Sequence, residues 1–303
     1  MSNDTILKGL LLDQTMRFTA IDAKGLVVEA QALHKTSRVC TAALGRTLMM
    51  TAMMGMELKN ENDRLTAIVK GGGPTGNIVC TARPGGAVKG YIENPEIELP
   101  LAPDGKLDVS MAVGWFGELT VVKDLAMREP YVGRCELVSG EIAEDFARYF
   151  TVSEQTPSLV YLGVRMDAQT GAVLGAGGLL LQPLPGCPEE HIELAMARAE
   201  NIKNLSTLLE NGHTLQEALH EVLDGLNIEV TETVAPRFLC DCSRDRLERV
   251  MISLGKEELE DLIEKDKGAT LTCHFCNTAY SFNETELKTL LEESLQKDDD
   301  HEA

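Results

Sequence analysis

Between residues 1 and 181, apolar and polar residues alternate over short runs that Gly and Pro separate. Alternation with a period of two predicts strands, here over residues 15–22, 26–33, 64–70, 76–83, 87–93, 158–166 and 172–181, with further strands up to about residue 138. Helical spacing predicts helices over residues 37–58 and 139–154. Because the strands gather in runs with few helices between them, we predict an α+β domain over residues 1–181.

The predicted helix over residues 37–58 is rich in methionine and contains Met49, Met50, Met53, Met54 and Met56. Methionine is a common filler of apolar cores, which favours a buried helix. Methionine-rich surfaces can also accept many partners, so Met49 and Met53 are alternative candidates for a surface that binds other proteins. Helical periodicity is the same in both cases and does not separate them.

Residues 182–188 combine prolines with a glycine and mark a boundary. Beyond it, helical spacing predicts one helix over residues 189–211, and a capping box from Thr214 to Glu217 begins a second. Two helices alone make a poor domain, so we predict that residues 182–227 form an amphipathic linker. The linker either completes a core or acts as a cover that can be lifted. Its candidate contacts for partner proteins are Ile192, Met196, Ile202, Leu205 and Leu209.

Four cysteines stand in two close pairs, Cys240 with Cys242 and Cys273 with Cys276. Four thiolates form the tetrahedral shell that Zn²⁺ prefers, so the pattern predicts one zinc ion per chain. Each pair can also form a disulfide on oxidation, and short loops close most readily, which favours pairing within each pair. We therefore interpret residues 228–303 as a C-terminal zinc-binding module that acts as a redox switch and ends in an acidic tail. A purely structural zinc site fits the same residues.

The other four cysteines, Cys40, Cys80, Cys135 and Cys187, stand far apart, as small buried residues do, and not as a secreted disulfide framework. The first residues do not resemble a secretory leader, and no apolar run reaches the ~18 residues of a membrane span. We therefore expect a cytoplasmic protein with no membrane partner.

The charge is concentrated in the C-terminal part. Residues 181–303 carry 11 Lys and Arg against 27 Asp and Glu, whereas nucleic-acid-binding zinc modules usually present a basic face. The glycine-rich residues 71–77 lack the Lys and Ser or Thr of a phosphate-binding loop, and residues 175–180 lack the third glycine of a dinucleotide fingerprint. Because catalytic motifs are also missing, we expect no nucleic acid, no nucleotide and no enzymatic activity.

The whole chain from residue 4 to about 295 resembles the 33-kilodalton redox-regulated heat-shock chaperone family. The resemblance rests most specifically on the two cysteine pairs with Phe238, Leu239, Asp241, Ser243, Tyr280 and Phe282, and also on residues 71–77, 154–158, 177–178, 182, 185–186 and 254–255. It implies a cytosolic, ATP-independent holdase that binds unfolding proteins during oxidative stress. It further implies activation by zinc release and disulfide formation, and an oxidised form that is a homodimer.

Two other classes of protein use similar residues. A thiol-disulfide oxidoreductase would turn over substrate disulfides with these cysteines, but residues 269–272 and 277–282 predict strands on both sides of the second pair. A thioredoxin-type Cys-x-x-Cys would instead begin a long helix. A constitutive zinc-ribbon protein that binds nucleic acid or a regulatory partner is the second alternative, and the acidic charge of residues 181–303 disfavours it.

Overall fold

The computed structural model describes residues 4–302, and the side chains of residues 4–293. The chain forms two compact units, one up to Leu239 and one from Cys240 onward. Each unit mixes helices and strands, which confirms the predicted α+β class.

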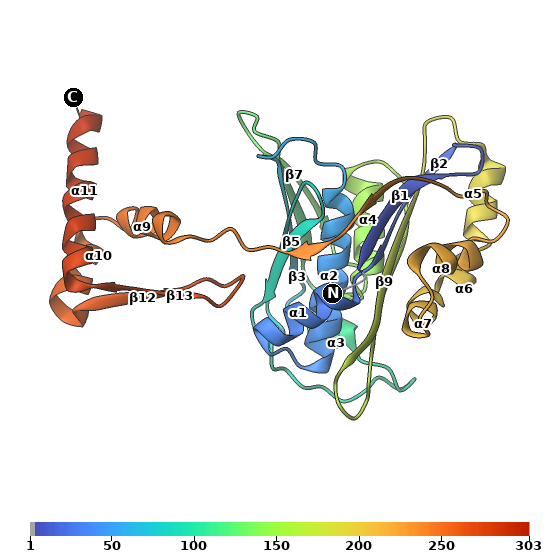
Figure 1. Cartoon of the computed structure of the whole chain (residues 1–303), viewed down its shortest axis with the longest axis horizontal. Helices are drawn as coiled ribbons and strands as arrows, with labels where there is room; N and C mark the ends of the chain where they lie inside the picture. Colours follow the sequence, from blue (N-terminus) through green and yellow to red (C-terminus); the bar gives the residue numbers. More distant parts are fainter. Residues whose placement is uncertain (1–3, 303) are drawn as a thin grey trace. The chain divides into compact units, whose positions relative to one another are not determined.

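The first unit contains two sheets that lie on either side of a long helix (Figure 1). The five-stranded sheet is antiparallel, with the order β10-β1-β2-β9-β8. Its strands are β1 Thr5–Leu11, β2 Met16–Asp22, β8 Leu159–Met166, β9 Val173–Pro183 and β10 Glu229–Val234. The predicted strands over residues 15–22, 158–166 and 172–181 are confirmed within two residues at their ends.

The six-stranded sheet has the order β11-β5-β4-β3-β6-β7 and is antiparallel except between β11 and β5. Its strands are β3 Arg64–Lys70, β4 Ile78–Arg83, β5 Ala87–Ile92, β6 Glu118–Asp124, β7 Tyr131–Glu136 and β11 Arg237–Phe238. Alternate residues of β3 and β4 are buried, as the period of two predicted. A short helix, α3 Val109–Val113, interrupts the predicted run of strands.

The helix between the sheets is α2, Arg38–Gly55, which confirms the prediction over residues 37–58. It begins after Ser37, whose hydroxyl accepts a hydrogen bond from the Cys40 N–H at 3.4 Å. Every residue of α2 is buried except Arg38 and Arg46. Met49 and Met53 are 0% and 1% exposed, so in this structure they belong to the core and do not form a surface. The second predicted helix is α4, Ala143–Ser153.

The strand predicted over residues 26–33 is wrong, because this segment is helix α1, Lys24–His34. Its buried apolar residues, Leu26, Val27 and Ala30, follow helical spacing and pack in the core with α2. The Asp4 carboxylate accepts hydrogen bonds from the N–H groups of Gly25 at 2.8 Å and Leu26 at 2.6 Å. These bonds satisfy backbone donors in the first turn, and they come from a residue far away in the sequence.

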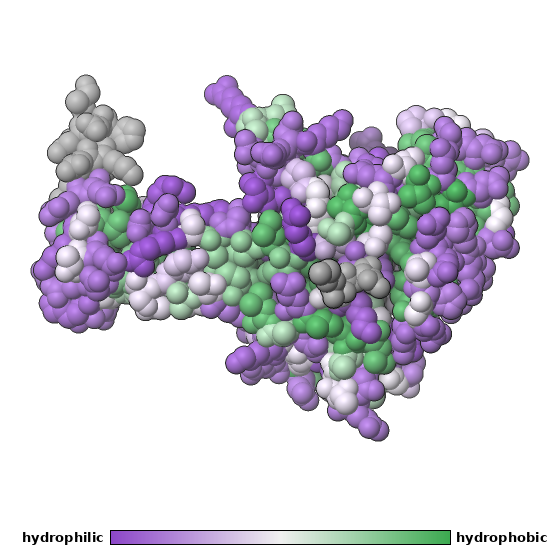
Figure 2. Space-filling model, viewed as in Figure 1, coloured by the Kyte–Doolittle hydropathy of each residue, from purple (hydrophilic) through white to green (hydrophobic). Residues whose placement is uncertain are grey.

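Residues 182–227 pack on the outer face of the five-stranded sheet as four helices and not as the predicted two. They are α5 Glu189–Met196, α6 Ala199–Ile202, α7 Leu205–Glu210 and α8 Leu215–Val222. The single helix predicted over 189–211 is broken near Ala197 and at Lys203–Asn204, where turns lie between the helices. The predicted capping box of Thr214 and Glu217 is present at the start of α8. The visible outer surface of α7 and α8 is mostly hydrophilic (Figure 2).

Three glycines allow α7 to lie directly on the sheet. A Cβ atom on Gly175 would lie 2.7 Å from the Ser206 carbonyl oxygen. Cβ atoms on Gly163 and Gly177 would lie 2.7 Å from Ser206 Oγ and 2.6 Å from Leu209 Cδ1. These distances are below normal contact distances, so larger residues on β8 and β9 would push α7 away from the sheet.

The structure groups residues 229–238 with the first unit, although we predicted that the C-terminal module begins near residue 228. β10 pairs with β1 over five residue pairs, whereas β11 pairs with β5 over only two. The first unit therefore extends to Leu239, immediately before Cys240.

The second unit contains a short hairpin and helices around a small core. Its elements are α9 Arg244–Ile252, α10 Lys256–Asp261, a π-helical turn Leu262–Asp266, β12 Gly268–Thr272, β13 Ala279–Asn283 and α11 Glu284–Glu302. The buried apolar residues of the unit are Met251, Leu259, Ile263, Phe282, Leu287 and Leu290. Arg244 stacks over the Phe282 ring at 4.4 Å and donates to Glu286 at 2.7 Å, which joins α9 to β13 and α11.

We predict that Asp4→Ala destabilises the first unit by about 1–2 kcal/mol, because the first-turn N–H groups of α1 lose their acceptor. The measurement is urea denaturation followed by circular dichroism. Asp224→Ala, which removes an exposed carboxylate from the same unit, is the control and should change stability by less than about 0.5 kcal/mol. Equal unfolding midpoints for the two variants would contradict this role of Asp4.

Candidate metal centre

The four predicted ligands meet at one point of the second unit. The Sγ atoms of Cys240, Cys242, Cys273 and Cys276 all lie within 4.8 Å of one another. The Cys240 and Cys273 sulfurs are 3.7 Å apart, and those of Cys242 and Cys276 are 3.3 Å apart. The structure therefore brings together two pairs that are separated by thirty residues of sequence.

The second pair lies in the turn between β12 and β13. The N–H groups of Cys276 and Asn277 donate to the Cys273 carbonyl at 3.3 and 2.7 Å, and the Cys273 N–H donates to Thr278 O at 3.0 Å. Asn277 adopts a left-handed conformation with φ 54°, which asparagine tolerates. The tight turn places both thiols on one side. It is a knuckle between strands and not the start of a helix, which disfavours the oxidoreductase alternative.

The first pair lies in the segment between the end of β11 and the start of α9. Ser243, directly after Cys242, caps α9 by accepting from the Arg246 N–H at 3.3 Å. Arg246 also forms an ion pair with Asp241, between the two cysteines, at 3.4 Å. These contacts fix the segment to α9, so the capped helix orients the first pair toward the hairpin.

Neighbouring hydroxyl groups contact two of the sulfurs. The Tyr280 hydroxyl lies 3.3 Å from Cys242 Sγ, and the Thr278 hydroxyl lies 3.2 Å from Cys276 Sγ. We did not predict either contact. The hairpin register could have indicated Tyr280, because it lies opposite Leu271, two residues before Cys273.

The thiols differ in acidity. Burial raises the pKa values of Cys240 and Cys242. Burial acts to raise the pKa of Cys276 as well, but hydrogen bonds with Thr278, Cys242 and Cys240 together outweigh it and lower that pKa to about 7. The hydrogen bond with Cys242 raises the pKa of Tyr280 to about 12.

The arrangement fits a tetrahedral metal ion. Sulfurs held ~2.3 Å from a central zinc lie about 3.8 Å from one another. The separations in the structure, from 3.3 Å to at most 4.8 Å, bracket this value. All four sulfurs are half-buried, and the group contains only soft thiol donors, which favour zinc over calcium or magnesium. A dication between the four sulfurs would favour the thiolate form of each.

The other cysteines do not take part in this site. Cys40, Cys80 and Cys135 are buried in the first unit, and Cys187 is half-buried there. Burial raises the pKa values of the first three thiols, to about 11 for Cys135. They are less reactive than an ordinary thiol, as expected for cysteines in a core.

The candidate contact residues in the linker divide into two groups. Ile202, Leu205 and Leu209 are 1%, 0% and 9% exposed, and they pack against β2 and β9. Ile192 and Met196 on α5 are 36% and 56% exposed. The structure therefore buries only the C-terminal half of the predicted stripe against the sheet.

Within the described residues, no helix is both long and apolar enough to cross a membrane.

Known proteins resemble this chain over nearly its full length. Residues 4–283 match the family model described as Hsp33 protein. The 33 kDa chaperonin of Clostridioides difficile is 43% identical over 290 residues, which cover 96% of this chain and 99% of that protein. The 33 kDa chaperonin of Bacillus cytotoxicus is 44% identical over 289 residues, covering 95% and 99%. The crystal structure of the 33 kDa chaperonin from Thermotoga maritima matches with a TM-score of 0.87 at 36% identity, covering 97% of this chain and 100% of that one.

We predict that the protein binds one zinc ion per chain through these four thiolates. Replacing Cys240 by Ser should weaken zinc binding at least tenfold, because a serine hydroxyl is not ionised at neutral pH and is a poor zinc ligand. The measurement is zinc content and chelator competition on the purified protein, with Cys187→Ser as the control. Full retention of zinc in the Cys240→Ser protein would remove the site as drawn.

Proposed function

The chain belongs to the Hsp33 family of redox-regulated chaperones, and we propose that its four clustered thiols form the switch of an ATP-independent holdase. The holdase binds unfolding proteins under oxidative stress. One observation carries the proposal: four sulfurs lie within 4.8 Å of one another in a unit with a small apolar core. Because the apolar core is small, the folded state of this unit depends on a crosslink between the segments that carry the cysteines.

Zinc held by Cys240, Cys242, Cys273 and Cys276 would supply a crosslink that contributes roughly 10–16 kcal/mol to the folding of a small module. Two segments of the second unit position the four ligands. The hairpin turn presents Cys273 and Cys276, and the segment before α9 presents Cys240 and Cys242. The crosslink therefore joins the two ends of the segment between Cys242 and Cys273, which contains α9, α10 and β12.

Oxidation changes the same atoms chemically. With hydrogen peroxide as oxidant, two thiols lose two electrons and two protons and form one S–S bond, and the peroxide is reduced to two molecules of water. A sulfur in a disulfide no longer carries the negative charge that makes a thiolate a strong ligand. Two disulfides therefore consume the complete ligand set, and the unit keeps only its small core.

We propose that unfolding of the second unit affects the first unit through the covalent connection between Leu239 and Cys240. Cys240 follows β11, which has only two paired residues, and β11 follows β10 and the linker helices. We propose that loss of order from Cys240 onward frays β11, and that the linker over residues 182–227 then loses support. Its apolar stripe and the sheet surface below it become available to client proteins.

The proposal also covers partners and location. Clients are unfolded or unfolding proteins, the oxidised form is a homodimer, and the protein acts in a reducing cytoplasm without nucleotide or nucleic acid. It is a binding protein and not an enzyme. The direct test is light scattering of a denatured client protein with the reduced, zinc-loaded chain and with the peroxide-treated chain. Equal suppression of aggregation by both forms would contradict redox control, and turnover in an insulin-reduction assay would favour the oxidoreductase alternative.

We predict that oxidation joins Cys240 to Cys242 and Cys273 to Cys276. The nearest sulfurs in the structure are those of the other pairing, at 3.7 and 3.3 Å, so proximity alone does not favour this outcome. Short loops nevertheless close most readily once the unit opens. Mass-spectrometric peptide mapping after peroxide treatment checks the pairing, with Cys40, Cys80, Cys135 and Cys187 expected to stay mostly reduced. A Cys240–Cys273 disulfide as the major product would be incompatible with the prediction.

We predict that Leu205→Glu activates the reduced protein while zinc stays bound. Leu205 is 0% exposed, so the variant loses about 1.5–3 kcal/mol of burial and places a carboxylate in an apolar cluster. Leu194→Glu is the matched control, because Leu194 lies in the same linker and is 45% exposed. The measurements are hydrogen exchange over residues 189–226, client light scattering and zinc content.

The wild-type protein should lose protection over the same residues when it is oxidised. If protection is the same in both redox states while chaperone activity still increases, the linker is not the cover and clients bind elsewhere.

A further inference from the structure

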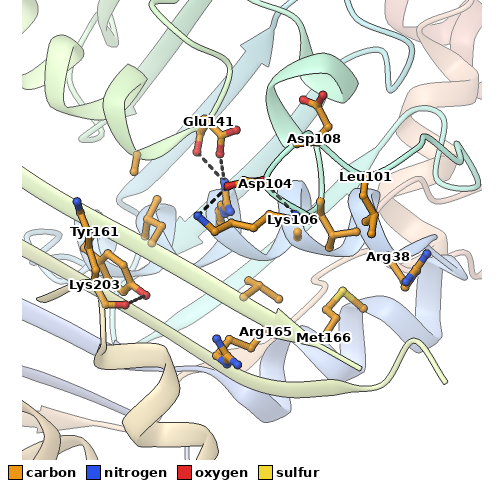
Figure 3. A pocket seen from close by; sticks show the side chains of 18 of the residues that line it. Arg38, Leu101, Asp104, Lys106, Asp108, Glu141, Tyr161, Arg165, Met166 and Lys203 are labelled. Atoms are coloured by element: carbon orange, nitrogen blue, oxygen red, sulfur yellow. Dashed lines mark hydrogen bonds and ion pairs between the residues drawn. The ribbon is translucent and has the colours of Figure 1, made fainter. Parts of the chain in front are cut away.

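A cavity of ≈ 930 Å³ lies in the first unit beside the five-stranded sheet, away from the linker helices' apolar stripe. Figure 3 shows that strand β8 forms one wall and the loop over residues 101–108 lies opposite it, with Leu101, Asp104 and Lys106 directed into the space. Helix α2 contributes the floor through Arg38, Ala42 and Arg46. The volume is in the range of ligand-binding pockets.

The wall formed by β8 is the edge of the sheet, because β9 is the only described strand that pairs with β8. The direction of its free hydrogen-bonding groups follows from the neighbouring strand. The Ala176 carbonyl accepts a hydrogen bond from the Ala23 N–H, and the Leu184 N–H donates to the Thr15 carbonyl. The backbone N–H and C=O groups of even-numbered residues of β9 therefore point toward β2. The N–H and C=O groups of odd-numbered residues of β9 point the other way, toward β8, and form hydrogen bonds with its odd-numbered residues.

The N–H and C=O groups of Val160, Leu162 and Val164 consequently point away from the sheet, and all three residues line the cavity. Within the part of the chain that the structure describes, these backbone groups have no hydrogen-bond partner. An open strand edge of this kind is a template for pairing with another extended chain.

The floor of the cavity carries two arginines from α2. Arg38 and Arg46 are the two residues of α2 that are not buried. Arg46 forms an ion pair with Glu141 at 2.5 Å, but its Nε atom is buried and lacks a hydrogen-bond partner among the described residues. Arg38 donates to the Ala168 carbonyl at 2.8 Å and forms no ion pair with a described residue. The Arg38 guanidinium can therefore donate to a carboxylate of a partner, whereas Arg46 already pairs with Glu141.

We propose that this groove binds an extended client segment, which adds as a sixth strand to the edge of β8 and places an acidic side chain near Arg38. The proposal rests on the chaperone function and names a client site distinct from the linker stripe. The backbone of the segment pairs with Val160, Leu162 and Val164 whatever its sequence, which suits a protein with many clients. Apolar side chains complement the apolar part of the lining. Because four carboxylates also line the cavity, the acidic side chain complements Arg38 and not the lining as a whole.

A single segment fits this edge better than a second copy of the chain. The loop over residues 101–108 lies across the groove from β8 (Figure 3). A single strand fits between β8 and this loop, whereas the sheet of a second copy would clash with the loop. On the opposite face of β8, the Tyr161 hydroxyl contacts Ser206 Oγ at 2.8 Å and donates to Lys203 O at 3.0 Å. Because Lys203 also lines the cavity, release of the linker would lengthen the accessible edge.

The test uses the oxidised, full-length protein and a blocked, fluorescent nine-residue peptide of alternating valine and threonine with one central glutamate. Binding should slow amide exchange at Val160, Leu162 and Val164, measured by NMR. Methylating the peptide nitrogens on alternate residues should weaken binding roughly tenfold for one of the two possible alternations and much less for the other. This probe keeps the side chains nearly unchanged and therefore isolates backbone pairing.

Two protein variants test the edge and the charge. Val160→Pro removes an outward N–H without removing a bond to β9, so the fold should persist while peptide affinity falls. Arg38→Gln should weaken binding of the glutamate peptide several-fold and leave a glutamine peptide unaffected, whereas Arg128→Gln, in an exposed loop away from the cavity, should change neither.

Unchanged exchange at the three amides during peptide binding would overturn the proposal. Protection that appears on oxidation without peptide, in step with dimer formation by sedimentation, would instead assign the edge to a second copy of the chain. Client light scattering on the same sample separates these outcomes from failure of the chaperone function. If aggregation is suppressed while the peptide does not bind, the groove proposal fails alone, and if the client aggregates, the proposed function fails.

Discussion

The burial of α2 between two sheets, with Arg38 and Arg46 as its two exceptions, is the constraint on which the first unit depends. The helix approaches its neighbours so closely that a Cβ on Gly55 would lie 2.7 Å from Ala82 Cβ, and one on Gly90 of β5 would lie 2.9 Å from a Leu48 methyl carbon. Interiors packed at this density change little with small forces. The inner face of β8, which packs against α2, is therefore held in place by the core.

The outer face of the same sheet is covered in a different way. Helices α5 to α8 have at most eight residues each, and helices of this length are not stable alone in water. Their stability comes from Leu205, Leu219 and similar residues that pack on β2 and β9, together with the close approach of α7 to Gly175. A segment that depends wholly on tertiary contacts opens at lower free energy than the core beneath it. The sheet thus combines a tightly packed inner face with an outer cover that depends on tertiary contacts.

Sequence periodicity predicted the elements whose pattern is local. β3 was predicted residue for residue, and α2 was found at the expected place, because their burial follows from spacing alone. The meeting of the four thiols was also predictable, since the number and spacing of the cysteines indicate a shared ligand. Spacing does not indicate Tyr280 beside Cys242, because that contact depends on the hairpin register.

The failures have physical causes that lie outside the local pattern. Alternation of apolar and polar residues suggested a strand over residues 26–33, yet this segment is helical because it packs with α2 and because Asp4 provides acceptors for its first turn. Residues 229–238 precede the cysteines directly, but their pairing partners are β1 and β5, which no nearby sequence predicts. The free edge of β8 became visible only with the strand order, because an isolated strand looks the same at an edge or in the centre.

The second unit shows how one set of atoms can hold or release a chain. In the reduced arrangement, Cys240 meets Cys273 and Cys242 meets Cys276, so any link between them closes loops of more than thirty residues around α9 and α10. A crosslink of that span removes much conformational freedom from the unfolded chain and stabilises a unit whose own core is small. Disulfides within each pair would close loops of only three or four residues and would leave the long segment unconstrained. The same cysteines would then be crosslinked, yet the unit would lose its long-range link. Disulfides across the pairs would preserve that link and keep the unit closed, so the pairing itself decides whether oxidation opens the protein or locks it.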